Sequence, residues 1–124
     1  MFEKKGSSIL NYKSKKFAIR IVKYIKEFGV ERNLQSIYNQ LLKSATSVHA
    51  NVLESEFAQS PADFASKLSI SLKETNETMG WLELLYGADC MSKQWYDSLS
   101  SDCKEIIAML VSSIRTIKRN NNIQ

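Results

Sequence analysis

A chain of 124 residues, of which 44% are hydrophobic, is long enough to bury one continuous core and too short for two ordinary domains. No segment contains the roughly 20 apolar residues that cross a bilayer, and the first residues lack the apolar run of a signal peptide, so we expect a cytoplasmic protein without a membrane partner. The formal net charge is +4, and the two cysteines match no metal-binding spacing, so the sequence gives no indication of a metal, a cofactor or redox chemistry.

Residues that interrupt secondary structure are rare. The sequence holds one proline and four glycines, and they separate long stretches with helical periodicity. This pattern predicts an all-α fold. In the first stretch Phe17, Ile21, Tyr24 and Phe28 recur at spacings of three or four residues, so they share one face of a helix. Gly29 follows and predicts the end of that helix.

Three further helices are predicted from their start signals and their apolar faces. The second opens at Asn33, a suitable N-cap; the third opens at Ser60, has Pro61 in its first turn and ends at Gly87; the fourth starts near Ser92. The apolar face of the second helix consists of Leu34, Tyr38, Leu41, Ala45, Val48 and Val52. That of the third consists of Phe64, Leu68, Leu72, Met79, Leu82 and Leu85. That of the fourth consists of Trp95, Leu99, Cys103, Ile106, Leu110, Ile114 and Ile117.

Four helices of roughly 18 to 28 residues joined by short loops favour antiparallel neighbours. We therefore predict an antiparallel, up-down-up-down four-helix bundle. It forms a single domain over residues 1–124, with frayed ends at about 1–8 and 119–124. In such a bundle the start of the first helix and the end of the last helix lie at the same end of the molecule.

The first helix carries more apolar surface than one core-facing stripe needs, and the fourth does too, through Ile107 and Val111. A bundle helix buries about three residues in seven, so the excess predicts a second packing surface and hence a homo-oligomer. A wider core stripe is the alternative. The predicted oligomer interface consists of Ala18, Ile19, Val22 and Ile25.

Charge is distributed unevenly along the chain. Residues 1–32 hold nine Lys or Arg and three Glu, residues 33–112 hold five basic and ten acidic residues, and residues 113–124 hold three basic residues and no acid. The two basic segments converge in the predicted bundle, and such a pole suits RNA or DNA because bound phosphates release condensed counterions. A solvated lysine surface is the alternative. The predicted nucleic-acid-binding residues are Lys4, Lys5, Lys13, Lys15, Lys16, Arg115, Lys118 and Arg119.

Polar residues interrupt the second and third helices where the two helices would face each other. An antiparallel pair that turns near Gln59 and Ser60 places Val48 level with Ser71, and small side chains there let the two backbones approach. Buried polar groups need hydrogen-bond partners. We therefore predict a structural polar network of Ser47, Asn51, Glu54, Lys67, Ser71 and Glu74.

Catalysis has little support in the sequence. His49 is the only histidine, whereas a carboxylate-bridged dimetal site in a bundle needs two Glu-x-x-His pairs. No glycine-rich phosphate loop is present, and no serine or cysteine has a recognisable paired histidine. We therefore predict no enzymatic activity, no catalytic residue and no metal site. A proton-transfer role of Asn51 and Glu54 is the remaining catalytic alternative.

A pattern in the second and third helices is shared with a known family. It consists of serine, an apolar residue, asparagine, two apolar residues and glutamate, here Ser47, Val48, Asn51, Val52, Leu53 and Glu54. It continues with an aromatic residue and Ser-Leu-x-Glu, here Phe64, Ser71, Leu72 and Glu74. With these residues the chain, from about Tyr12 to Lys118, resembles the four-helix-bundle proteins encoded in intervening sequences of bacterial large-subunit ribosomal RNA genes. The chain departs from that family at Ser55, where glycine is usual, at Ser69 and Ile70, and before Ser47, where only Lys43 represents a basic run.

The resemblance implies a homo-oligomeric ring, usually a pentamer, with no known catalytic activity. A more distant branch, the accessory proteins of diversity-generating retroelements, forms pentameric barrels that bind nucleic acid and a reverse transcriptase. Two functions therefore stay open. One is a nucleic-acid-binding accessory protein that acts through the basic pole. The other is a protein-interaction scaffold, such as a reverse-transcriptase partner, that acts through its apolar surface.

Overall fold

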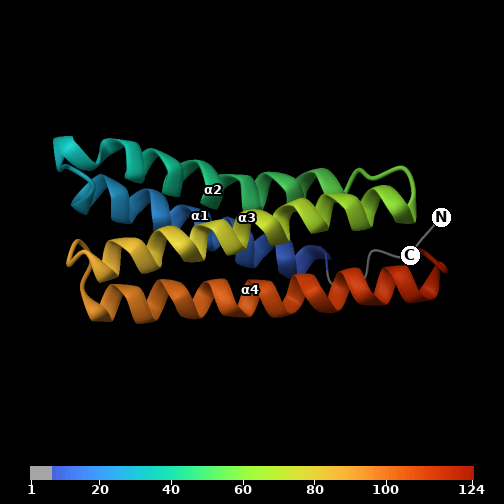
Figure 1. Ribbon diagram of the computed structural model, residues 1–124. Coiled ribbons are helices and arrows are strands. Elements are labelled where there is room, and N and C mark those ends of the chain that lie inside the picture. Colours follow the sequence, from blue (N-terminus) through green and yellow to red (C-terminus); the bar gives the residue numbers. More distant parts are fainter. Residues whose placement is uncertain (1–6) are drawn as a thin grey trace.

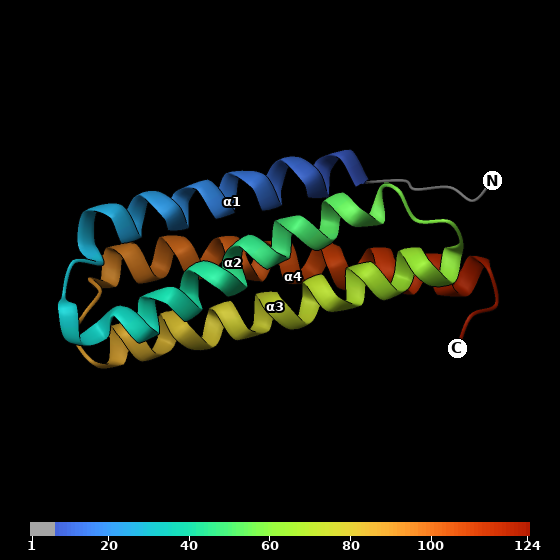
Figure 2. The same ribbon diagram turned by 90° about the horizontal axis from the view of Figure 1, so that it is seen from above.

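The computed structural model describes residues 7–124, and these residues form a four-helix bundle. The elements in chain order are α1 (Ser7–Phe28), a short 3-10 helix η1 (Arg32–Leu34), α2 (Gln35–Ser55), α3 (Pro61–Gly87) and α4 (Lys93–Asn120). Consecutive helices run in opposite directions, and the start of α1 lies at the same end as the end of α4 (Figures 1 and 2). The predicted all-α, up-down-up-down bundle is confirmed. Among the neighbouring helices, α1 and α4 contact each other least.

The starts of α3 and α4 follow from their capping serines. The Ser60 hydroxyl accepts a hydrogen bond from the backbone N–H of Asp63 at 3.0 Å, and the Ser92 hydroxyl accepts one from the backbone N–H of Trp95 at 3.1 Å. Each bond satisfies one of the N–H groups that a helix start leaves without a partner in the helix. The predicted starts at Ser60 and Ser92, and the predicted end at Gly87, are confirmed.

The predicted start of α2 at Asn33 is wrong. Asn33 lies inside η1, and α2 begins at Gln35 without a side-chain cap. The Gln35 side-chain amide donates instead to the backbone carbonyls of Gly29 and Glu31, at 2.8 and 3.0 Å. The chain after α1 therefore tightens into a 3-10 turn that uses the Gln35 side chain to satisfy carbonyl groups, and the N-cap of α2 is Leu34, one residue after the predicted Asn33.

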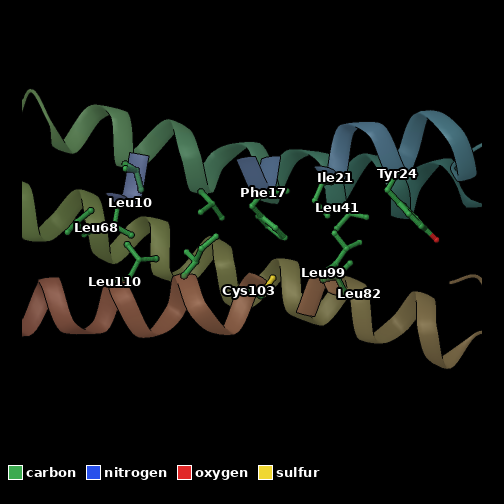
Figure 3. Packing of buried hydrophobic residues seen from close by; sticks show 14 of the residues in the cluster. Leu10, Phe17, Ile21, Tyr24, Leu41, Leu68, Leu82, Leu99, Cys103 and Leu110 are labelled. Carbon is green, nitrogen blue, oxygen red and sulfur yellow. The ribbon is translucent and has the colours of Figure 1, made fainter. Parts of the chain in front are cut away.

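The predicted apolar faces meet in one core (Figure 3). Leu10, Phe17 and Ile21 of α1 point toward the same interior as Leu68 of α3 and Leu110 of α4, and all five are at most 1% exposed. Phe28 departs from the predicted stripe, because it is 40% exposed at the end of α1, where its ring contacts those of Tyr24 and Trp95. Of the second-helix stripe, only Leu34 is not fully buried.

The two cysteines do not form a disulfide. Cys103 is buried in the core, and Cys90 is half-buried near the turn between α3 and α4. Burial raises the pKa of the Cys103 thiol to about 12, so this thiol stays protonated at neutral pH. Over residues 7–124, no helix has both the length and the apolar character that crossing a membrane requires.

Candidate functional site

The predicted basic residues lie along α1 and α4. Lys4 and Lys5 fall outside the described residues. Lys13, Lys15 and Lys16 lie in the first half of α1, and Arg115, Lys118 and Arg119 lie in the last two turns of α4. All of them are at least partly exposed. Both groups are in the half of the bundle that holds the start of α1 and the end of α4 (Figure 1).

The described basic residues are spread along the bundle, and the predicted pole also includes Lys4 and Lys5, which lie outside the described residues. The Lys13 ammonium contacts the Glu105 carboxylate of α4 at 3.1 Å, so Lys13 is level with Glu105. Arg115 lies ten residues further along α4, which corresponds to about 15 Å of helix rise. We call the described set Lys13, Lys15, Lys16, Arg115, Lys118 and Arg119 the basic stripe.

The same end of the bundle also carries the acidic turn between α2 and α3. Glu54 forms an ion pair with Lys67 at 3.4 Å, and the Glu56 carboxylate accepts two hydrogen bonds from the Asn11 amide at 3.0 and 3.1 Å. Asp63 faces the start of α3. Positive charge is therefore concentrated on the α1 and α4 side of this end, and negative charge on the α2 and α3 side.

A small groove separates α1 and α4 beside the basic stripe. It encloses about 170 Å³ and is lined by Lys13, Lys16, Phe17, Arg20, Asp102, Glu105 and Ile106. Arg20 forms an ion pair with Asp102 and donates a hydrogen bond to the Ser98 hydroxyl. Of the three cations, Lys16 makes no ion pair with a described residue.

Sequence reasoning missed Arg20 as a member of this groove. Its spacing from Lys13 and Lys16, seven and four residues, was a usable signal, because such spacings place three side chains on one side of a helix. The two carboxylates on α4 were not predictable as its partners, because the rotation of α4 against α1 determines which of the exposed acids in α4 enter the groove.

The predicted polar network is partly assembled between α2 and α3. The Ser71 hydroxyl donates to the Val48 carbonyl at 2.8 Å, in the register expected from the turn, and Lys67 bridges to Glu54. Asn51 instead donates within its own helix, to the Ser47 carbonyl at 2.9 Å. The Glu74 side chain makes no hydrogen bond or ion pair with another described residue.

Further buried hydroxyl groups lie along the contact between α2 and α3 and were not predicted from the sequence. The Thr78 hydroxyl donates to the Ser44 hydroxyl across the helices at 2.8 Å, and both residues are fully buried. Thr75 is also fully buried and donates to the Ser71 carbonyl. Short hydroxyl side chains allow close helix packing and keep their polar atoms satisfied; the Thr78 bond to Ser44 joins α3 to α2, and the Thr75 bond lies within α3.

His49 pairs with a serine that the sequence did not reveal. Its Nδ1 lies 2.9 Å from the Ser14 hydroxyl of α1, and burial followed by the nearby Lys15 ammonium lowers the His49 pKa, while Glu56 acts in the opposite direction. Ser14 is fully buried and also donates to the Asn11 carbonyl. A serine that is closed to solvent cannot receive a substrate, so this pair joins α1 to α2 and does not form a nucleophilic site.

The predicted interface residues on α1 differ in exposure. Ile19 and Val22 are 46% and 45% exposed, so their side chains point away from the bundle. Ala18 is 8% exposed and Ile25 packs against the core, so the subunit itself covers most of both. Two of the four predicted residues are therefore available to a second subunit. Ile107 and Val111 of α4 are half-buried.

Comparison with known proteins identifies similar chains. Residues 8–112 match the family model of the 23S rRNA-intervening sequence protein. A crystal structure of a protein with unknown function from the S23 ribosomal protein family of Bacteroides thetaiotaomicron is 42% identical, with a TM-score of 0.84 over 88% of this chain and 97% of that chain. No curated protein matches the chain. The matched segment runs from α1 through most of α4.

Proposed function

The chain belongs to the 23S rRNA-intervening sequence protein family, and we propose that it is a non-enzymatic, homo-oligomeric accessory protein that binds nucleic acid electrostatically through the basic stripe. The similar crystal structure is of a protein with unknown function, so family membership does not name an activity. The proposal therefore depends on the chemistry of this chain.

The observation that carries the proposal is the uncompensated charge at the end of α4. From Ile106 to Gln124 the chain contains no acidic residue, and Arg115 and Arg119 are exposed. Neither arginine forms an ion pair with another described residue. Exposed guanidinium groups without carboxylate partners are suited to phosphate oxygens, and side chains at a helix end reach phosphates without entering a groove.

Binding of this kind is weakly selective for sequence and strongly dependent on salt, because it neutralises phosphates and reads no base edges. Self-association would multiply the contacts, since each subunit contributes its own stripe. The expected oligomer is the pentamer implied by the resemblance described above.

The test is a titration of fluorescent single-stranded RNA and duplex DNA, followed by anisotropy over a range of salt concentrations. Replacing Arg115, Lys118 and Arg119 by glutamine should weaken binding to both by at least about tenfold and make the salt dependence shallower. The matched control replaces Arg32, Lys43 and Lys93, which lie outside the stripe, and should bind almost as tightly as the wild type. Equal losses in both variants, or affinity that is indifferent to salt, would contradict the proposal.

A protein-interaction scaffold is the second candidate, and the exposed apolar residues favour it. Phe57, in the turn after α2, is 82% exposed, and Leu53 and Tyr12 are also exposed. Exposed aromatic residues are common anchors of protein interfaces. Retention of a reverse transcriptase or another partner protein by the wild type, and its loss on Phe57→Ser, would favour the scaffold over nucleic-acid binding.

A further inference from the structure

The outward side of α1 carries an apolar stripe bordered by lysines. Tyr12, Ile19 and Val22 are 60%, 46% and 45% exposed, and their spacings of seven and three residues place them on one side of the helix, away from the core. The exposed lysines that border them are Lys15, Lys16, Lys23 and Lys26. A helix side that is both apolar and basic needs a partner that is both apolar and acidic.

The outward side of α3 has that complementary character. Ile70 and Leu84 are 41% and 56% exposed, and the exposed Glu77 lies midway between them at the same seven-residue spacing. Glu83 is exposed on the same helix, and so is Lys73, between Ile70 and Glu77, so acids outnumber bases on this side of α3. Gly80 leaves a gap in this surface, because a Cβ atom placed there would meet nothing within 4 Å. An opposing side chain could therefore approach the backbone of α3 at Gly80.

The two surfaces lie at the same height along the bundle. Ser14 of α1 contacts His49 of α2, and the adjacent Val48 accepts the hydrogen bond from Ser71 of α3, so Ser14 and Ser71 are roughly level. Further along, the ring of Tyr24 packs on Trp95 of α4, and the adjacent Tyr96 stacks on Tyr86 of α3.

Ile19 lies midway between Ser14 and Tyr24, and Gly80 lies near the middle of the corresponding segment of α3, so these two residues are level within about one helical turn. The helices α1 and α3 run parallel, and their backbones do not approach each other within the subunit. Figure 2 shows them on opposite sides of the bundle. The two surfaces therefore cannot cover each other in one molecule.

We propose that the α1 surface of one subunit packs against the α3 surface of a second copy of this chain, head to tail. The proposal rests on the self-association included in the proposed function and names the two surfaces that produce it. Lys23 then faces Glu83, and Ile19 enters the gap above Gly80. Subunits in a closed ring are related by rotation without translation, so in a ring whose axis is parallel to the bundle the surfaces that meet lie at equal heights, as these do.

The alternative symmetric contacts are disfavoured by charge. Packing α1 against α1 of a second copy would bring two rows of lysines together, and packing α3 against α3 would bring Glu77 and Glu83 near their own copies. Like charges across an interface cost association energy, whereas the head-to-tail contact pairs opposite charges. It also leaves Arg115 and Arg119, at the end of α4, outside the contact.

The head-to-tail contact is tested with two variants that each disable one surface. One carries Ile19→Asp and Val22→Asp on α1; the other carries Gly80→Gln and Leu84→Gln on α3. All four positions are exposed, so each variant should keep its helices, and circular dichroism is the measurement that checks this. By light scattering, the wild type should be an oligomer and each variant alone a monomer of 14.2 kDa. Mixed together, the variants should form a one-to-one dimer and nothing larger, because each supplies the surface that the other lacks.

A second pair of variants tests the charges without changing apolar residues. Lys23→Glu and Glu83→Lys should each weaken association about tenfold, and the chain that carries both changes should recover it. An α3 variant that keeps the wild-type mass, or a mixture that stays monomeric, overturns the head-to-tail contact while self-association stands. A wild type that is monomeric at micromolar concentration overturns both, and the RNA titration still decides nucleic-acid binding separately.

Discussion

The contact that His49 makes between α2 and α1 should make the stability of the subunit depend on pH. His49 sits between α1 and α2, bonded to the buried hydroxyl of Ser14, with Lys15 and Glu56 nearby. Burial is the largest cause of its lowered pKa, and the Lys15 ammonium adds to it. The neutral imidazole is thus the form that the folded subunit prefers, and protonation favours the unfolded chain.

Stability should therefore fall as the pH drops through 6.5, the ordinary value for histidine. In that window the unfolded chain binds the proton before the folded one does, and the loss ends once the pH is below the lowered folded pKa. Urea unfolding midpoints measured above and below pH 6.5 should drop more for the wild type than for His49→Asn, which keeps a polar group near Ser14 but does not titrate. Lys15→Gln should reduce the drop, and parallel pH profiles for all three proteins would contradict this account.

The hydroxyl pair of Thr78 and Ser44 permits a second test at single residues. Thr78→Val keeps the shape of the side chain but removes its bond to Ser44, and should lower the free energy of unfolding by about 1 kcal/mol. Ser44→Ala should cost a similar amount, and the double variant should cost less than the two losses together, because both remove the same contact.

Thermal or urea unfolding measures this coupling. Thr46→Val is the control, because Thr46 is exposed and bonds only to carbonyls of its own helix. If the loss in the double variant equals the sum of the two single losses, the two hydroxyls act independently, and their bonds to carbonyls of their own helices account for the effects.

At the scale of elements, the two glycines Gly29 and Gly80 should respond to alanine with opposite signs. A Cβ at Gly29 would lie 2.7 Å from the Ile25 carbonyl oxygen, so Gly29→Ala should destabilise the end of α1. Gly80 is exposed within α3 with open space around it, so Gly80→Ala should raise the free energy of unfolding by about 1 kcal/mol through helix propensity. Urea unfolding at concentrations low enough to keep subunits apart measures both; a stabilising Gly29→Ala would be inconsistent with the geometry of this turn.

Helices and their buried faces were predictable because periodic spacing reports a local property of the chain. Phe17, Ile21 and Tyr24 follow that rule, and the serine caps at Ser60 and Ser92 are equally local. The start of α2 was not predictable, because it depends on where the Gln35 amide finds carbonyl partners in the preceding turn.

The candidate site was less accessible from sequence, because its contacts depend on rotations between helices. The stripe containing Lys15 and Arg115 followed from topology, whereas the acidic partners of Lys13 and Arg20 required the packing of α4 on α1. The position of Ser71 level with Val48 was predictable from the turn, but its hydrogen bond to the Val48 carbonyl was not, because an antiparallel register does not determine side-chain direction. Asn51 has the predicted level and points back along its own helix.

At the scale of the whole molecule, opposite charges are arranged on different sides of the bundle. The α1 and α4 side carries the basic stripe, and the outward side of α3 carries Glu77 and Glu83. Head-to-tail packing would pair Glu77 and Glu83 with the lysines of the next α1, which include Lys15 and Lys16 of the basic stripe, and would leave Arg115 and Arg119 exposed. On the oligomer, the arginines at the end of α4 would therefore make the contacts to a polyanion.

The groove between α1 and α4 should limit this attraction. Asp102 and Glu105 hold Arg20 and Lys13 in ion pairs beside the unpaired Lys16, so two carboxylates compete with phosphates for the same cations. Replacing them by Asp102→Asn and Glu105→Gln should tighten RNA binding about fivefold at low salt, and the gain should shrink as salt screens the charges. Because both ion pairs are partly exposed, the loss of stability should stay within about 1 kcal/mol.

The matched control is Glu27→Gln with Glu31→Gln, which removes the same charge at the opposite end of the bundle. If net charge alone determined affinity, both double variants would bind RNA equally tightly. If phosphates are bound beside the groove, only the groove variant should bind RNA more tightly. Adding Arg20→Gln to that variant should remove most of the gain in affinity, because Asp102→Asn frees the Arg20 guanidinium for a phosphate. Anisotropy titrations of the three variants and the wild type at two salt concentrations separate a local phosphate contact from a general attraction by charge.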